Sequence, residues 1–178
     1  MKFKLIFILL VVAVFVSSRY LFFREGENER FIPLDICEEV SIAKEQQAAQ
    51  EVKENINIFS TTTETIFGLT SEGTEQVVYR DANDNIGLVT HIHFGAAGKS
   101  EAEFYFNGGF ISYILKRNLE YTVPITELTY EDIKLVATKE FLMDKERNLC
   151  EWYLDGELQV NNVDAQDLVD FLVSNIIE

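Results

Sequence analysis

The sequence predicts an α+β fold: an antiparallel β-meander covered on one face by an N-terminal and a C-terminal helix, after an N-terminal signal peptide or anchor. Three observations predict it. The chain opens with an apolar run, paired apolar segments then recur around turn residues, and helix-like composition precedes and follows these pairs. Because the members of each pair are adjacent in the chain, each strand is expected to pair with its sequence neighbour.

The first residues have the parts of an export signal. Lys2 and Lys4 precede an unbroken apolar run at 5–16, and two small residues, Ser17 and Ser18, follow it; this order is typical of a signal peptide. A helix over that run spans about 18 Å, which is less than the hydrocarbon core of about 30 Å. With the apolar residues at 20–23 added, the segment becomes long enough to stay as an anchor.

Cleavage and retention of this leader both remain open, and both have the same consequence. The lysines ahead of the apolar run keep the N-terminus in the cytoplasm and place the domain outside it. We therefore expect a periplasmic or otherwise extracytoplasmic protein, anchored in the inner membrane if the leader is retained. The predicted organisation is a leader at 1–23, a charged tether at 24–34 and a single domain at 35–178.

The chain is strongly acidic. It has 30 acidic and 15 basic residues and a net charge of −15; from Glu25 onward, 30 acidic residues face 11 basic ones, which leaves −19. Nucleic-acid binding is excluded because attraction to phosphates needs a basic patch. The membrane is expected to be contacted only through the N-terminal segment. The charge serves either solubility or attraction to a basic protein partner.

Secondary structure follows from composition and periodicity. A helix is expected at 38–54, which has neither Gly nor Pro, and another at the C-terminus after Asp164, where Leu168, Phe171, Leu172 and Ile176 recur at helical spacing. A further short helix is expected at 129–136. The expected strands are 58–69 and three hairpins: 76–80 with 86–94, 101–106 with 110–116, and 139–143 with 149–154. Gly108 and Gly109 predict the tightest of these turns.

Side-chain alternation predicts which face of the sheet is buried. With a turn at 95–100 and a two-residue turn at 108–109, one apolar face is expected to contain Ile86, Leu88, Ile92, Phe94, Ala102, Phe104, Phe106, Ile111, Tyr113 and Leu115. Both helices are expected to cover that face.

The hairpin at 103–110, which reads EFYFNGGF, resembles the Y-Y-F-x-N-G-x-L hairpin of small exported bacterial proteins and lipoproteins of unknown function. The segments 77–79 and 91–99 are similar to the paired strands and G-x-x-G-K turn of that family, and 149–157 to its closing hairpin. The resemblance covers about residues 38–157 and implies an extracytoplasmic antiparallel sheet. It implies no catalytic residues, and Gly109 stands where the family has a longer side chain.

Two histidines are the only candidates for metal chemistry. His91 and His93 lie two apart in a predicted strand, so their side chains leave the same face, where the expected register also puts Glu103. Two imidazoles and one carboxylate are a ligand set that hydrolytic zinc sites use. Three ligands on a solvated strand would lack the enclosing walls of such a site, so alternation of polar and apolar residues is the preferred interpretation.

No other motif predicts a cofactor or a catalytic reaction. The Gly95 to Gly98 spacing is too short for a phosphate-binding loop, and no nucleophile elbow is present. Cys37 and Cys150 are the only cysteines. In an oxidising compartment they could form one disulfide that contributes about 4 kcal/mol; two buried free thiols are the alternative.

Aromatic residues near acids are the remaining candidates for binding. Tyr105 and Tyr153, with Glu103, would form a protein-binding surface if they share an uncovered sheet face, since Tyr often anchors interfaces. The predicted function is an extracytoplasmic acidic protein-binding module of the inhibitor or immunity-protein kind. A metal-dependent hydrolase using His91 and His93 and a structural protein of the cell envelope are the alternatives.

Overall fold

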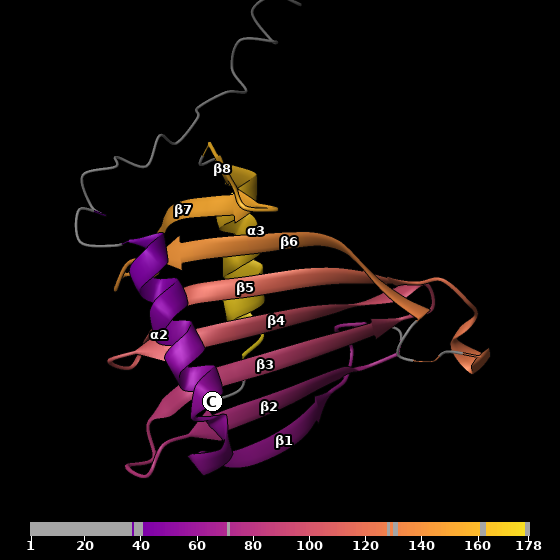
Figure 1. Cartoon of the computed structure of the whole chain (residues 1–178), viewed down its shortest axis with the longest axis horizontal. Coiled ribbons are helices and arrows are strands. Elements are labelled where there is room, and N and C mark those ends of the chain that lie inside the picture. Colours follow the sequence, from indigo (N-terminus) through magenta and orange to yellow (C-terminus); the bar gives the residue numbers. More distant parts are fainter. Residues whose placement is uncertain are drawn as a thin grey trace, which may run out of the picture. The chain divides into compact units, whose positions relative to one another are not determined.

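Eight strands form one antiparallel sheet in which each strand pairs with its sequence neighbour (Figure 1). The structure is a computed structural model, and it describes residues 37, 41–70, 72–127, 129, 132–160 and 163–176. The strands are β1 (Ser60–Ile66), β2 (Thr74–Arg80), β3 (Ile86–Gly95), β4 (Gly98–Asn107), β5 (Phe110–Tyr121), β6 (Ile133–Met143), β7 (Leu149–Leu154) and β8 (Glu157–Gln159). The predicted α+β class and the meander are confirmed.

In the described part of the chain, two α-helices accompany the sheet. They are α2 (Ile42–Glu54) before it and α3 (Val163–Ser174) after it, and two short 3-10 helices, η2 (Ile56–Ile58) and η3 (Ile125–Glu127), lie between other elements. The predicted leader and tether, at 1–34, lie outside the described residues. Within the described part, no helix is both long and apolar enough to cross a membrane.

The three predicted hairpins are present. Gly108 and Gly109 form the β4–β5 turn with φ of 61° and 86°, a conformation that suits a two-residue hairpin turn and costs glycine little. The β3–β4 turn is shorter than expected: Gly95 pairs with Gly98, which leaves two residues between them. Gly98 is required there because a Cβ would collide with the carbonyl oxygen of Leu119.

This short turn corrects the predicted register. Leu88 pairs with Tyr105 and Val89 with Phe104, so Phe104 lies on the opposite face from Leu88. A slip of one residue moves every side chain of a strand to the other face, and the longer turn assumed from the sequence caused such a slip. A second shift, between Tyr105 and Phe106, pairs Phe104 with Ile114 of β5. The expectation that one face contains Leu88, Phe104 and Tyr113 together is therefore wrong.

The sheet is buried on both faces, each beneath a different helix. One apolar cluster joins Ala49 of α2 to Leu88, Tyr105, Tyr113, Leu142 and Cys150. The other joins Ala165, Val169 and Leu172 of α3 to a set that includes Val89, Phe104, Ile114 and Phe141. These sets alternate along the strands, and Figure 1 shows α2 in front of the sheet and α3 behind it. The prediction that both helices cover one face is therefore corrected to one helix on each face.

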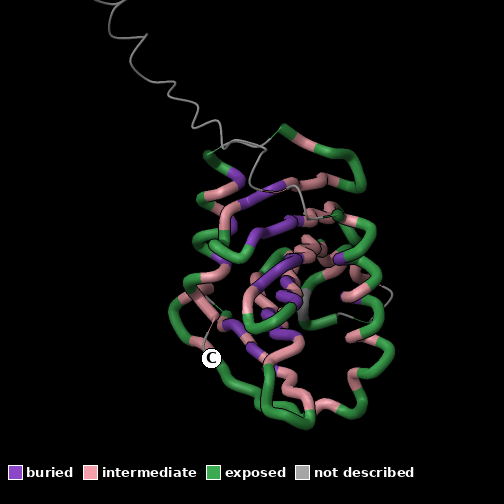
Figure 2. Tube along the Cα trace, turned by 90° about the vertical axis from the view of Figure 1, so that its left-hand side faces the viewer, coloured by how far each residue is buried: buried purple, intermediate pink, exposed green. Residues whose placement is uncertain are grey.

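Burial follows this three-layer arrangement (Figure 2), in which the interior of the strands is buried and the turns are exposed. Helix α3 is amphipathic, with its buried residues at i, i+4 and i+7. The secondary structure differs from the prediction in two further places. Residues 133–136 belong to strand β6 instead of a helix, and strand β8 was not predicted.

A disulfide ties the segment before α2 to the sheet. Cys37 and Cys150 are bonded, with their Cα atoms 5.7 Å apart and a sequence separation of 113. Cys150 lies in β7 and is buried in the cluster beneath α2, and Cys37 packs against that cluster. The bond thus fixes the chain close to the start of α2 against the sheet.

Candidate functional site

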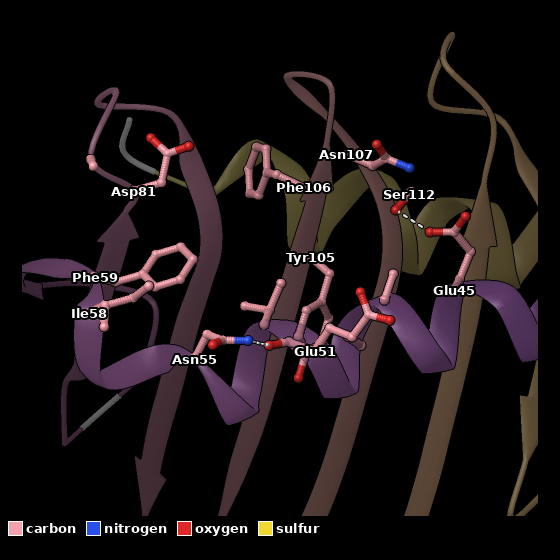
Figure 3. Close-up of a pocket in the computed structure, with 14 residues that line it drawn as sticks. Glu45, Glu51, Asn55, Ile58, Phe59, Asp81, Tyr105, Phe106, Asn107 and Ser112 are labelled. Atoms are coloured by element: carbon pink, nitrogen blue, oxygen red, sulfur yellow. Dashed lines mark hydrogen bonds between the residues drawn. The ribbon is translucent and has the colours of Figure 1, made fainter.

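A cleft opens between α2 and the sheet, at the end where the β2–β3 and β4–β5 hairpins turn (Figure 3). It has a volume of about 530 Å³. Its lining comes from α2 and the following turn (Glu45, Ala48, Ala49, Glu51, Val52, Asn55, Ile58, Phe59), from the β2–β3 turn (Asp81, Ala82) and from β4 and β5 (Tyr105, Phe106, Asn107, Ser112). Segments distant in sequence thus share one surface.

Most of the cleft wall is apolar. Ala48 and Val52 come from one side of α2, and Phe106 comes from the β4–β5 hairpin. Ile58 is 74% exposed, an unusual exposure for a large aliphatic side chain beside a cleft. Phe59 lies at the same end; a Cβ at Gly87 would collide with its ring, so the glycine leaves room for that wall.

All the ionisable groups of the cleft other than Tyr105 are carboxylates. They are Glu45, Glu51 and Asp81, and no Lys, Arg or His is among the lining residues. Glu45 is 7% exposed, and its Oε2 accepts a hydrogen bond of 2.6 Å from the Ser112 hydroxyl. Glu51, by contrast, is exposed on α2. The cleft therefore has one buried and one exposed carboxylate beside apolar walls.

Asp81 is held in its position by the turn that contains it. Its Oδ1 accepts hydrogen bonds from the backbone N–H of Asn83 at 2.8 Å and of Asn85 at 2.9 Å, and the Asn85 side-chain amide also donates to its carboxylate. These bonds, led by those from Asn85, lower the pKa of Asp81. The carboxylate is thus ionised and fixed in orientation at the cleft rim.

A network of half-buried charges supports Tyr105 under α2. The Tyr105 hydroxyl donates to Glu103 at 2.5 Å, and Glu103 also pairs with Lys53 of α2 at 2.8 Å and Arg117 of β5 at 2.9 Å. Burial raises the pKa of Tyr105, and the neighbouring Glu103 raises it further. The tyrosine therefore stays protonated and acts as a hydrogen-bond donor. A similar pair beside it joins Tyr113 to Glu140 at 2.5 Å.

We expect Glu103→Gln to lower the free energy of unfolding at pH 7 by about 1–3 kcal/mol, because it leaves Lys53 without its carboxylate and Arg117 with only the longer contact, of 3.6 Å, to Glu101. Burial acts to raise the pKa of Glu103, but Lys53, Tyr105 and Arg117 together lower it. A lowered pKa in the folded state stabilises the protein above about pH 4.5 and loses that contribution as the pH falls further. The difference between wild type and variant should therefore shrink in acid. Urea unfolding at several pH values measures it.

The exposed Glu64 of β1 provides the control, since Glu64→Gln removes a carboxylate on a solvated strand. It should change stability by less than about 0.5 kcal/mol at any of these pH values. Equal losses in the two variants would contradict a specific role for the Glu103 network.

The structure places the three residues predicted to form a binding surface on one face of the sheet, but it does not leave that face uncovered. Tyr105 and Tyr153 belong to the same face, but α2 covers it, and Tyr105 is only 3% exposed. Tyr153 lies on β7 outside the cleft lining, and its hydroxyl donates to Glu151 at 2.8 Å. Burial raises the pKa of Tyr153 to about 12, with Glu151 adding to the effect. Glu103 is enclosed by its ion pairs.

The predicted metal ligands His91, His93 and Glu103 do not share a face of the sheet. His91 pairs in register with Ala102, which puts Glu103 on the other face of the sheet from both histidines. His91 is 1% exposed, and burial lowers its pKa to about 4. In the described part of the chain, no group of three or more His, Cys, Asp or Glu side chains is arranged to hold a metal ion.

The cleft was not predicted from the sequence. The β2–β3 turn at its rim was predictable, because Asp81 followed by Asn83 and Asn85 is a pattern typical of a turn closed by an aspartate side chain. No local sequence pattern indicated that α2 lies against the β4–β5 hairpin. This contact depends on which face of the sheet the helix covers, and hence on the register.

Comparisons of the chain with protein-family models, with curated proteins and with solved structures find no match. The resemblance of 103–110 to the hairpin of exported bacterial proteins stays a prediction. The function is therefore inferred from the site itself.

Proposed function

We propose that this chain is an acidic protein-binding module that acts outside the cytoplasm and takes a basic segment of a partner protein into the cleft under α2. The observation that carries the proposal is the composition of the cleft wall: apolar side chains beside Glu45, Glu51 and Asp81, with no basic residue. Such a surface is complementary to an apolar or aromatic side chain flanked by lysine or arginine.

The charge of the whole molecule supports the same partner chemistry. With −15 on the chain, long-range attraction would speed the encounter with a cationic protein and keep acidic proteins away. Asp81, fixed by its turn, contributes a carboxylate that needs no reorganisation on binding. The proposed mode is that of an inhibitor or immunity protein, which captures its partner without chemistry.

The extracytoplasmic location is supported by two features. The lysines and apolar run at 2–16 are typical of an export signal. The bond between Cys37 and Cys150 is of a kind that persists in oxidising compartments. A reporter enzyme that is active only outside the cytoplasm, fused to the C-terminus, tests the location; activity of a cytosol-dependent reporter alone would overturn it.

A charge reversal at the cleft tests the binding site. The full chain in mild detergent is titrated with a fluorescent peptide that carries an aromatic residue between lysines. Glu51→Lys should weaken binding about tenfold, or about 1.4 kcal/mol, at low salt. Ala48→Trp, which fills the cleft, should weaken it at least as much while leaving the net charge unchanged.

The matched control is Glu64→Lys, the same charge change on the exposed strand β1, away from the cleft. It should have little effect on binding. Equal weakening by Glu51→Lys and Glu64→Lys would show that only net charge matters. Equal binding of a peptide analogue with glutamate in place of lysine would overturn the proposal.

A further inference from the structure

The face of the sheet on the α3 side has a second region with the opposite charge. Beyond the apolar cluster, the register aligns His91, Ala102, Lys116 and Lys139 across β3, β4, β5 and β6. The next positions on the same face are His93, Ser100 and Asn118. Four neighbouring strands thus bring two lysines and two histidines together.

Contacts within this group and with its neighbours hold its members in place. The Lys139 ammonium lies over the Trp152 ring of β7, 5.9 Å from its centroid. The Lys116 ammonium donates to the Ser100 hydroxyl. Nδ1 of His93 is 2.8 Å from Oγ1 of Thr74, and the ring centroids of His91 and His93 lie 5.7 Å apart. His93, Ser100, Lys116 and Lys139 are half-buried, so their polar ends remain within reach of a small solute.

Among the described residues, no carboxylate forms an ion pair with the positive charge here. Every ion pair in the described residues uses another cation, namely Lys53, Arg80, Lys99 or Arg117. Glu103, the closest acid in the sequence pattern, points to the other face. Along β5 the nearest carboxylate on this face is that of Glu120, which is exposed and lies opposite Lys134 in register.

Cations on neighbouring strands that have no carboxylate partner raise the free energy of the folded state. Burial, and then the charge of Lys139, lower the pKa of Lys116; burial, and then Lys116, lower the pKa of His93. In a chain with twice as many acidic as basic residues, this arrangement is unexpected. A bound anion would relieve the repulsion, whereas a metal cation would add to it.

We propose that Lys116, Lys139 and His93, with the Ser100 hydroxyl, form a binding site for a small multivalent oxyanion of the phosphate or sulfate kind. Two ammonium groups, an imidazole and a hydroxyl supply the donors that such an ion accepts. The acidic remainder of the chain repels extended polyanions, which limits the site to a small ion. The site lies across the sheet from the cleft and is independent of its function.

The test is a titration of the full chain in mild detergent with inorganic phosphate near pH 6, with sodium chloride at matched ionic strength as the reference. Because the chain has only two histidines, imidazole NMR signals report the site directly. Phosphate should shift the His93 signals saturably and raise the pKa of His93. Lys116→Gln should weaken the affinity by about 10- to 100-fold, as expected for loss of a hydrogen bond to a charged group.

Lys134→Gln is the matched control, since Lys134 is an exposed lysine on the same strand as Lys139; its affinity should equal that of wild type. Lys139→Gln provides a second variant if Lys116→Gln fails to fold. No saturable shift beyond that of chloride, or equal loss in Lys134→Gln, would overturn the proposal. Binding to vesicles that contain an anionic phospholipid without any effect of free phosphate would also overturn it.

Discussion

Replacing Phe104 by alanine is expected to lower the free energy of unfolding by about 3–5 kcal/mol, a large fraction of the stability of a domain of this size. Phe104 is completely buried in β4, between Val89 of β3 and Ile114 of β5 in the register. Its ring also contacts the His91 ring at 5.1 Å between centroids. The variant loses the transfer free energy of the ring and leaves a cavity beneath α3. Urea unfolding followed by circular dichroism measures the change.

The control for this variant is Phe67→Ala, the same substitution at a side chain that is 85% exposed. It should change stability by less than about 0.5 kcal/mol. The pair thus tests whether Phe104 is buried in the core. A small loss for Phe104→Ala, equal to that of Phe67→Ala, would contradict the packing of this residue under α3.

The hairpins were predictable because their signals are local. Gly108 and Gly109 adopt the positive φ that their turn requires, and β4 and β5 pair across it, with a register shift between Tyr105 and Phe106 that the sequence did not indicate. The assignment of faces was not predictable in this way. Tyr105 and Phe104 are both apolar enough to be buried, so composition does not tell which belongs with Leu88; the two-residue turn before Gly98 decides it.

Short segments were difficult to predict from the sequence for a different reason. Residues 133–136 (IKLV) have no clear period, and they form the start of β6 because β5 is long enough to pair with them. Strand β8 has only three residues, and Gly156 with φ of 85° turns the chain back onto β7. In both cases tertiary pairing overrides a weak local preference.

Knowledge of the register also changes the interpretation of the candidate site. From sequence, Tyr105, His91 and Glu103 looked like one exposed surface. In the structure, Glu103 pairs with Lys53 of α2 on one face, while His91 lies buried on the other, in the same row of the register as Lys116 with Ala102 between them. The cleft with its carboxylates and the cluster of Lys116, Lys139 and His93 therefore lie on opposite faces of one sheet. The net charge of −15 is a sum over the whole chain and indicates neither of them.

Removing the disulfide is expected to have an effect as large as that of Phe104→Ala. The bond between Cys37 and Cys150 closes a loop with a sequence separation of 113. In the chain-entropy model such a loop contributes about 4–5 kcal/mol by restricting the unfolded chain. The double variant Cys37→Ala/Cys150→Ala should lose about that amount, and the start of α2 should become more sensitive to protease because its attachment to β7 is gone.

Wild type and double variant are unfolded in urea with and without a thiol reductant. The reductant should lower the midpoint of the wild type to that of the variant and leave the variant unchanged, which separates loss of the bond from loss of side-chain packing at the buried Cys150. Alkylation of the protein in intact producing cells extends the test to the compartment. Thiols blocked without prior reduction would show that the bond does not form there, and would remove one of the two supports for a location outside the cytoplasm.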